Sequence, residues 1–306
     1  FTAKYSIKTN SNLEILKMAL DEGLNADAMS PGEIHVLLKA GFPKERIFYV
    51  SNNVSKDELQ YAIDQGVTIS LDSLSQLKRF GEINRGGRCA VRLNPGVGAG
   101  HHEKVVTAGK KTKFAIAEAD IPSVKEIASR YDLKIIGINQ HIGSLFMDGT
   151  PFLTAVSHFL EMAMQFQDLE FVDFGGGFGI PYHKLSGEKE FDLALFGTAL
   201  EELVEDWAGR YGRKIVFKSE PGRYIAAEGG VILGTVHAKK QNSGITYVGT
   251  DVGMNVLIRP SMYDSWHDIE VYRGGKIRDP EDGSEKVTVV GNICESGDIL
   301  AKDREL

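Results

Sequence analysis

The sequence has little of several features that mark particular classes of protein. It contains only two cysteines, Cys89 and Cys294, which lie far apart and without the spacing of a metal site. A disulfide framework is therefore not indicated, and a reducing, cytoplasmic location is expected. No apolar run approaches the ~18 residues that indicate a membrane-spanning helix, and no signal peptide opens the chain.

Positive charge is also scarce. The 306 residues include 35 Lys and Arg against 42 Asp and Glu, and the densest basic stretch is Lys110-Lys111 with Lys113. A nucleic-acid surface needs clustered basic residues, so none is expected. The adjacent histidines of His101-His102-Glu103 cannot easily chelate one ion, and no third ligand is evident, so no metal site is expected.

What the sequence does contain is a repeated unit, in which a short apolar run ends in polar or glycine residues and a helix-length segment usually follows. Eight such runs occur, at residues 2–7, 24–28, 46–50, 67–71, 89–93, 134–139, 170–174 and 214–218. Strand, polar tip and helix repeated eight times predict a (β/α)₈ TIM-type barrel. Catalytic groups lie at the C-terminal strand ends of that fold, so these tips are the candidate site.

Helix start signals support this pattern. Ser30-Pro31-Gly32-Glu33 predicts an N-cap, a first-turn proline and a capping-box acid, and Ser55 and Ser73 begin two further helices in the same way. The longest predicted helices cover 152–166 and 193–211. After Arg223 the pattern becomes β-rich, with runs at 231–239, 245–252, 269–272 and 286–291. We therefore expect a barrel at 1–224, an all-β second domain at 225–306, and incomplete termini at both ends.

Lys8 stands at the tip of the first run, in Tyr5-Ser6-Ile7-Lys8-Thr9-Asn10. Burial at an inner strand tip would lower the pKa of a lysine and make its amine nucleophilic enough for a Schiff base. A surface lysine that merely ends a strand is the alternative, and this segment alone leaves both open.

The residues that follow the later runs favour a catalytic role for Lys8 over a surface position. Gly175-Gly176-Gly177 follows the seventh run and Glu220-Pro221-Gly222-Arg223 the eighth, and loops after strands 7 and 8 bind phosphate in many barrels. Glu220 could keep a pyridine nitrogen protonated, which strengthens the ring as an electron sink. His141 could lie on the ring face, although an ordinary core histidine is the common alternative, and Ser144 could bind phosphate. Together these residues indicate pyridoxal 5′-phosphate.

Five motifs carry a resemblance to a known family. Tyr-Ser-Ile-Lys-Thr-Asn, His-Ile-Gly-Ser, Gly-Gly-Gly-Phe-Gly, Glu-Pro-Gly-Arg-Tyr and Cys-Glu-Ser-Gly-Asp occur in this order along nearly the whole chain. The chain resembles the fold-type III pyridoxal-phosphate-dependent decarboxylases, and within them the diaminopimelate decarboxylase group. Arg92-Leu93-Asn94-Pro95 and the segment from Leu257 to Asp264 are similar to that group as well.

The resemblance implies a role for each matching residue. Lys8 would bind the cofactor covalently, Asp27 would lie near it, His141 would stack on the ring and Glu220 would face the pyridine nitrogen. The phosphate would be held by Ser144, Gly176, Gly177 and the backbone of Gly222 and Arg223. The substrate, a diamino diacid such as meso-diaminopimelate, would be held by Arg223, Arg259, Tyr263 and Glu295, because arginine meets a carboxylate with two parallel hydrogen bonds.

Cys294 would supply the proton that replaces the lost carboxyl group, and the product would be L-lysine and carbon dioxide. In the family this loop crosses a dimer interface, so a homodimer with Cys294 and Glu295 contributed by the neighbouring subunit is implied. Cys89 is expected to be an inert core residue. The family also has a tyrosine beyond the cysteine loop, and no such segment follows Leu306. The chain as given is therefore not assured of activity.

Three other functions remain open. A related decarboxylase could act on another amino acid or a carrier-bound glutamyl group, although Arg223, Arg259 and Glu295 favour a diacid. A racemase of the same fold type would place an arginine at the pyridine nitrogen, where this chain has Glu220. A catalytically dead regulatory relative is disfavoured because Lys8, Glu220 and Cys294 are all present.

Overall fold

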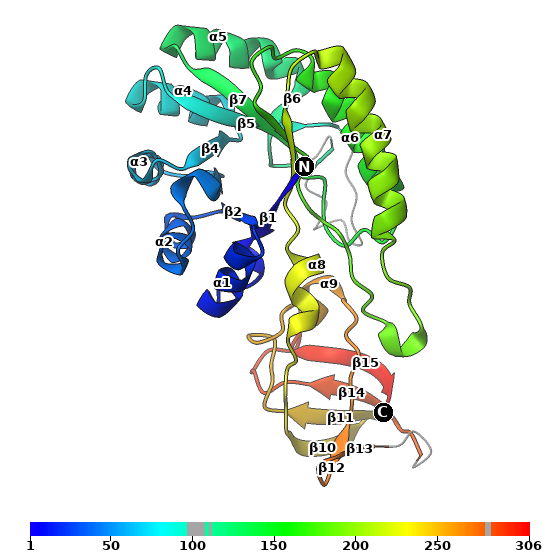
Figure 1. The fold of residues 1–306 in the computed structure, drawn as a ribbon. Coiled ribbons are helices and arrows are strands. Elements are labelled where there is room, and N and C mark those ends of the chain that lie inside the picture. The colour runs from blue at the N-terminus through cyan, green and yellow to red at the C-terminus, as the bar shows by residue number, and fades with distance from the viewer. Residues whose placement is uncertain (97–107, 110–111, 279–282) are drawn as a thin grey trace. The chain divides into compact units, whose positions relative to one another are not determined.

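The computed structural model describes residues 1–96, 108–109, 112–278 and 283–306 (Figure 1). The chain forms two compact units. The first consists of Phe1–Ile180 and Phe191–Gly229, and the second consists of Pro181–Glu190 and Gly230–Leu306.

Eight parallel strands close into a ring in the first unit. They are β1 (Thr2–Ser6), β2 (Asn25–Ala28), β3 (Ile47–Val50), β4 (Thr68–Leu71), β5 (Arg88–Asn94), β7 (Lys134–Asn139), β8 (Phe171–Asp173) and β9 (Val216–Ser219). They pair in the order β4-β3-β2-β1-β9-β8-β7-β5, and β4 pairs with β5 to close the ring. The two-residue β6 (Ile116–Ala117) adds to β5. Each predicted apolar run overlaps one ring strand, so the (β/α)₈ prediction is confirmed.

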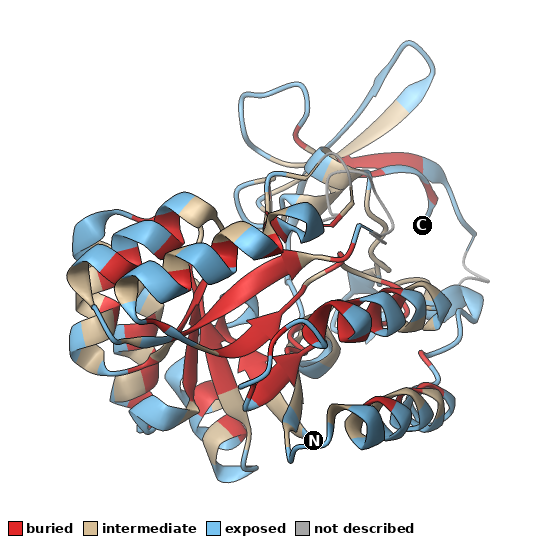
Figure 2. Ribbon diagram, turned by 90° about the horizontal axis from the view of Figure 1, so that it is seen from above, coloured by how far each residue is buried: buried red, intermediate tan, exposed pale blue. Residues whose placement is uncertain are grey.

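Helices surround the ring (Figure 1). They are α1 (Leu13–Asp21), α2 (Pro31–Ala40), α3 (Lys56–Gln65), α4 (Leu74–Ile83), α5 (Ile121–Tyr131), α6 (Thr150–Ala163), α7 (Leu193–Tyr211) and the short α8 (Arg223–Ala226). Figure 2 shows buried strands inside helices whose outer faces are exposed. This is the arrangement expected when parallel strands are covered by amphipathic helices.

The predicted N-cap serines are present, but two of the three predicted capping boxes are incomplete. At α4 the Ser73 hydroxyl accepts from the Gln76 N–H at 3.3 Å, whereas the Gln76 amide donates to the Val54 carbonyl at 2.8 Å. Ser55 and Glu58 form a complete capping box at α3. At α2 the Ser30 hydroxyl accepts from the Glu33 N–H at 3.2 Å, as predicted. The Glu33 carboxylate, however, accepts from the N–H of Met29 rather than of Ser30. The acid still satisfies a backbone donor ahead of the helix, one residue earlier than the capping-box pattern predicts.

The barrel core has two layers. A large layer lies between strands and helices and includes Trp207, whose indole N–H donates to the Leu160 carbonyl at 2.7 Å. A separate small cluster comprises Phe48, Val50, Ala90, Ile136 and Phe171. The buried polar residues next to it include hydrogen-bonded pairs such as Ser70 and Asn139 (2.5 Å). The C-terminal strand ends are therefore built largely from polar groups.

The second unit is a small sheet. Its strands β10 (Val236–Asn242), β11 (Ile245–Thr250), β14 (Lys286–Val290) and β15 (Ile299–Glu305) pair in that order. A short hairpin, β12 (Tyr272–Arg273) with β13 (Lys276–Ile277), and the five-residue helix α9 (Arg259–Tyr263) complete it. The β-rich character is confirmed, although the run at 231–239 becomes a strand only from Val236. The core is a small cluster of Val287, Val289 and Ala301.

The boundary between the units lies close to the predicted domain boundary. The sequence pattern places it after residue 224, whereas the compact units meet between Gly229 and Gly230. Residues 181–190 also group with the sheet unit. The division into folding domains at 1–224 and 225–306 stays a prediction, because compactness does not show which segments fold independently.

Candidate active site at the barrel mouth

Lys8 lies in a one-turn 3₁₀ helix, Ile7–Thr9, just after β1. Its side chain is exposed. Lys8 therefore follows the first strand rather than ending it, and of the two alternatives that the sequence left open the structure shows the exposed lysine. The chain leaves extended geometry at Ser6, whose N–H donates to the Pro221 carbonyl at 3.1 Å. A Cβ at Gly222 would lie 2.3 Å from the Thr9 hydroxyl. These contacts place the Lys8 turn directly against the loop that follows β9.

Two carboxylates are buried near this turn. Asp27 at the end of β2 pairs in register with Ser6, and neither of its carboxylate oxygens has a hydrogen-bond partner. Burial raises the pKa of Asp27 to about 6, while the Lys8 ammonium opposes that rise. Burial also raises the pKa of Glu220 well above its usual range, and the charges of Asp173 and Asp27 add to the effect.

His141 and the glycine loop form one wall. The Gly176 N–H donates to His141 Nδ1 at 3.3 Å, so this nitrogen is an acceptor. Burial lowers the pKa of His141 well below its usual value, and the positive charges of Lys8 and Arg92 act in the same direction. The imidazole is therefore neutral. The Gly176 amide, which the sequence assigns to phosphate, is directed at His141 here, and its phosphate role stays a prediction.

The glycine run is dictated by close packing. A Cβ at Gly176 would lie 2.0 Å from the Glu220 carbonyl, and one at Gly177 would lie 2.4 Å from the Gly143 carbonyl. Gly177 also has φ of 116°, which side chains rarely tolerate. The loops after β7, β8 and β9 thus touch through their backbones at positions that only glycine can occupy.

Ser144 and Arg223 meet at the same mouth. The Arg223 Nη2 donates to the Ser144 hydroxyl at 3.1 Å. The structure therefore brings together the candidates Lys8, Asp27, His141, Ser144, Gly176, Gly177, Glu220, Gly222 and Arg223 at the C-terminal ends of the ring strands. This is the edge where barrels carry their active sites.

Sequence reasoning missed two buried charges beside this group, Lys4 and Asp173, and named a third, Arg92, only as part of a strand-tip motif. Lys4, within β1, forms an ion pair with Asp173 of β8, and both side chains are almost completely buried. Arg92 is also buried, and its guanidinium lies 4.8 Å from the Phe114 ring centroid. A lysine and an aspartate inside otherwise apolar runs were the available signal, since such residues are rarely buried unless they are paired.

Four candidates belong to the second unit. Arg259 begins α9, its guanidinium lies 4.4 Å from the Tyr182 ring centroid, and its Nη1 lies 2.9 Å from His267 Nε2. Tyr263 ends the same helix. Cys294 and Glu295 are exposed in the loop between β14 and β15.

The cysteine loop has a defined anchor. Buried Asp298 accepts hydrogen bonds from the N–H groups of Ile293 (2.7 Å) and Met254 (2.6 Å). Cys89, by contrast, is fully buried in β5, and burial raises the pKa of its thiol to about 12. That value agrees with the inert core role expected for Cys89.

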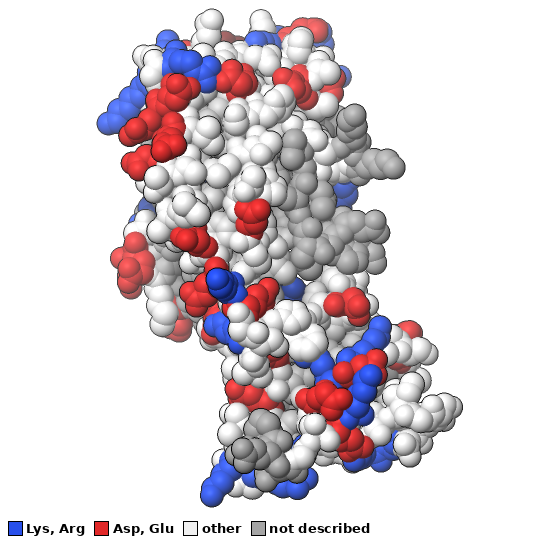
Figure 3. Space-filling model, turned by 90° about the vertical axis from the view of Figure 1, so that its right-hand side faces the viewer, with Lys and Arg blue, Asp and Glu red and all other residues white. Residues whose placement is uncertain are grey.

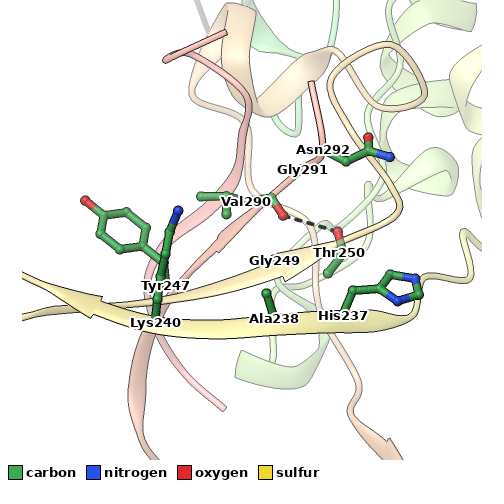
Figure 4. A pocket seen from close by; sticks show the side chains of 9 residues that line it. All are labelled: His237, Ala238, Lys240, Tyr247, Gly249, Thr250, Val290, Gly291 and Asn292. Carbon is green, nitrogen blue, oxygen red and sulfur yellow. Dashed lines mark hydrogen bonds between the residues drawn. The ribbon is translucent and has the colours of Figure 1, made fainter. Parts of the chain in front are cut away.

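The sheet unit also has a hollow of about 230 Å³ on β10, β11 and β14 (Figure 4). His237, Lys240 and Tyr247 lie around it, and Thr250 donates to the Val290 carbonyl at 3.3 Å. None of the predicted site residues lines this hollow. Its lining has no buried charge comparable to Asp27 or Glu220, so the barrel mouth remains the stronger candidate.

A family model settles which family the chain belongs to. The model described as pyridoxal-dependent decarboxylase, pyridoxal binding domain, matches residues 1–227. The chain belongs to the pyridoxal-dependent decarboxylases. It is accordingly an enzyme, a carboxy-lyase, and its cofactor is pyridoxal phosphate.

Within this family, the chain is similar to proteins named diaminopimelate decarboxylase. A diaminopimelate decarboxylase of Methanothermobacter thermautotrophicus is 42% identical over 313 residues, which cover 100% of this chain and 72% of that relative. A crystal structure of diaminopimelate decarboxylase from Helicobacter pylori complexed with L-lysine has a TM-score of 0.88 at 30% identity, covering 100% of this chain and 75% of that one. A Vibrio vulnificus lysine/ornithine decarboxylase, at 19% identity and a TM-score of 0.81, shares the fold.

The described residues fit the cofactor. Glu220 Oε1 and both Asp27 oxygens are buried without hydrogen-bond donors, and a protonated pyridine nitrogen is a donor of the kind that Glu220 lacks. The neutral His141 and the exposed Lys8 amine stand beside them. Among the described residues no cluster of potential metal ligands occurs. His101, His102 and Glu103, named above, lie outside the described residues.

Proposed function

We propose that this enzyme removes the carboxyl group from the D-configured α-carbon of meso-diaminopimelate and releases L-lysine and carbon dioxide. The relatives named diaminopimelate decarboxylase support this substrate, as does the L-lysine bound in the Helicobacter pylori structure. The single observation that carries the chemistry is the pair of buried carboxylates, Asp27 and Glu220, beside the Lys8 turn, where both Asp27 oxygens and Glu220 Oε1 lack a hydrogen-bond donor.

Each barrel residue has a task in this proposal. Lys8 is the covalent anchor, and its exposed amine is accessible to an aldehyde. Glu220 would accept a hydrogen bond from the pyridine nitrogen and keep that nitrogen protonated, and the neutral His141 would help to hold the ring. Ser144, Gly176, Gly177, Gly222 and Arg223 hold the phosphate. When bound, pyridoxal phosphate withdraws electrons from the bond to the departing carboxyl group.

Asp27 acts on the Lys8 amine. Its buried carboxylate has a pKa raised to about 6, so it is largely ionised at neutral pH and attracts the Lys8 ammonium. That attraction holds the amine near the mouth and gives the proton of Lys8 a nearby acceptor.

The second unit supplies substrate recognition. Arg259 and Arg223 bind the distal carboxylate, Tyr263 donates its hydroxyl to the same group and Glu295 accepts the distal ammonium. Cys294 donates the proton to the carbon that has lost its carboxyl group. In a homodimer, Cys294 and Glu295 would serve the barrel of the neighbouring subunit, and their exposure in the loop supports this.

The proposal also covers the kind of ligand and the location of the enzyme in the cell. On the face in Figure 3, acidic and basic side chains of the described residues are interspersed rather than gathered by sign, which favours a small-molecule substrate over a nucleic acid. No described helix is long and apolar enough to cross a bilayer. We place the enzyme in the cytoplasm, in lysine biosynthesis.

The test is carbon dioxide release from meso-diaminopimelate with added pyridoxal phosphate, with L-lysine and L-ornithine as competing substrates. Lys8→Ala should abolish release and the absorbance of lysine-bound cofactor together. Lys17→Ala, on the exposed face of α1, is the matched control and should leave both unchanged. Turnover of lysine or ornithine in place of meso-diaminopimelate would discard the substrate and keep the cofactor site.

A further inference from the structure

Lys4 is a buried cation inside the barrel. Its side chain is 2% exposed, and its ammonium is paired with the Asp173 carboxylate. The same nitrogen lies 3.4 Å from the Phe48 ring centroid and 3.9 Å from Glu220 Oε1. Burying such an ion costs several kcal/mol unless the pairing is good. An ordinary apolar residue would fill this space at lower cost, so the charge calls for an explanation.

Asp173 ties this ion pair to the glycine loop. Its Oδ1 accepts a hydrogen bond from the Gly175 N–H at 2.9 Å, and the Gly175 carbonyl accepts from the Glu220 N–H at 2.9 Å. Lys4, Asp173, Gly175 and Glu220 therefore form one network across β1, β8 and the end of β9. A change in the Lys4 charge acts on Glu220 both through space and through this backbone link.

Glu220 is surrounded by charges of both signs. The groups that act on it are Lys4 and Lys8 from the β1 side, Asp27 from β2, Arg92 from β5, Asp173 from β8 and Lys218 from β9. Burial and the two aspartates favour the protonated acid, whereas Lys4 and Lys8 favour the carboxylate. In the proposed function Lys8 is bonded to the cofactor, so its amine is no longer a free ammonium. Lys4 is then the ammonium that lies close enough to Glu220 to favour its ionised form.

We propose that Lys4 is a positioning residue that keeps Glu220 ionised under the pyridine nitrogen, because its ammonium neutralises Asp173 and attracts the Glu220 carboxylate. The inference rests on the proposed function, since it requires that Glu220 meets the pyridine ring. A carboxylate accepts the pyridine N–H and stabilises its positive charge, whereas a protonated Glu220 does neither. Lys4 thereby acts on the cofactor without touching it.

The experiment compares cofactor binding among variants of the whole protein. The variants are Lys4→Met, which keeps the length and removes the charge, Asp173→Asn, which can still accept from Gly175, and their combination. Lys134→Met is the control, because this exposed lysine stands at the start of β7, the opposite end of that strand from the mouth. The Kd of pyridoxal phosphate is measured from the absorbance of lysine-bound cofactor between pH 6 and pH 9, as a ratio to the unmodified protein.

We expect Lys4→Met to weaken cofactor binding about tenfold or more at pH 7, the effect of a one-unit rise in the pKa of Glu220. The ratio should approach one as the pH rises, because Glu220 ionises late in this variant. The double variant should recover most of the affinity, since it removes Asp173 repulsion as well. Lys134→Met should stay within about threefold of the unmodified protein.

Other outcomes overturn the inference. A double variant as weak as Lys4→Met, with a ratio independent of pH, would make Lys4 a packing residue only. If Lys4→Met does not fold, as judged by its Tm, the double variant is compared with Asp173→Asn alone, and equal cofactor affinity of these two proteins at every pH overturns the inference. Cofactor that is absent from the unmodified protein overturns the proposed function as well, whereas bound cofactor indifferent to Lys4 overturns this inference alone.

Discussion

Individual residues at the barrel mouth are held in states that cost stability. Asp27 is fully buried, its oxygens have no hydrogen-bond donor, and its pKa is raised to about 6. Burial raises the pKa of Glu220 well above its usual range as well. Carboxyl groups that lose so much solvation are typical of sites that a ligand completes.

We predict that Asp27→Asn stabilises the cofactor-free protein at neutral pH. The folded state binds the Asp27 proton more tightly than the unfolded chain does, since the pKa rises from 3.8 to about 6. Stability is therefore greatest below pH 3.8 and falls as the pH rises toward 6, by about 3 kcal/mol in all. Asparagine has no proton to lose, so it escapes this penalty.

Urea unfolding of both proteins at pH 5, 6 and 7 measures this effect. The free energy of unfolding of Asp27→Asn should exceed that of the unmodified protein by a margin that grows with pH. An equal margin at all three pH values would show that Asp27 does not titrate in this range. The same substitution should reduce carbon dioxide release, because the Lys8 amine loses its nearby acceptor.

Single residues were predictable from the sequence only where they follow a strand. Asp27, His141 and Glu220 each stand at the end of an apolar run, and the barrel rule locates such residues without coordinates. Lys4 and Asp173 lie inside runs, where a shift of one residue would turn each side chain from the ring interior to the helices. Their pairing depends on β1 and β8 lying within reach across a closed ring, which no local pattern encodes.

At the level of elements, the loops after β7, β8 and β9 are held together by glycines. Gly176 is packed against the Glu220 carbonyl and Gly177 against the Gly143 carbonyl. Loops that touch through their backbones can present N–H groups to a ligand with little freedom to move. Their rigidity is thus part of the site.

We predict that Gly176→Ala loses cofactor binding and destabilises the protein. A Cβ there would meet the Glu220 carbonyl at 2.0 Å, so the loops after β8 and β9 must separate. Strain from overpacking of this kind costs about 1–3 kcal/mol. Gly197→Ala is the control, because nothing lies within 4 Å of its Cβ in the exposed face of α7.

Thermal unfolding and cofactor titration check both glycine variants. Gly197→Ala should raise the free energy of unfolding by about 0.5–1 kcal/mol, since alanine favours the helix, and should leave cofactor binding unchanged. Tight cofactor binding by Gly176→Ala would contradict the close packing of these loops.

Elements with strong local signals were predictable, and elements stabilised by tertiary contacts were not. α7 spans Leu193–Tyr211 as its periodicity predicts, and capping serines begin α2, α3 and α4. β15 was not predicted, because four of its seven residues are charged. It forms because Ala301 joins the small core and buried Arg304 lies over the Trp266 ring, 2.9 Å from its centroid.

At the scale of the whole molecule, the proposed chemistry is divided between two units. The cofactor residues belong to the first unit, and Arg259, Tyr263, Cys294 and Glu295 belong to the second. Cys294 is exposed in a loop whose backbone Asp298 fixes. An exposed thiol in a rigid loop can serve a barrel other than its own, which is the arrangement that the proposed homodimer requires.

We therefore predict that two inactive variants restore activity when they share a dimer. Lys8→Ala lacks the cofactor anchor and Cys294→Ala lacks the proton donor, so each is inactive alone. In a mixed dimer one of the two sites has both an intact Lys8 and the partner's intact cysteine. Random pairing in equal amounts gives half mixed dimers, so about a quarter of the original rate of carbon dioxide release should return.

Mixing Lys8→Ala with a Lys8→Ala/Cys294→Ala double variant creates no complete site and should return none. If each site instead used its own Cys294, the first mixture would stay as inactive as its components, and the shared site would be wrong even with the chemistry intact.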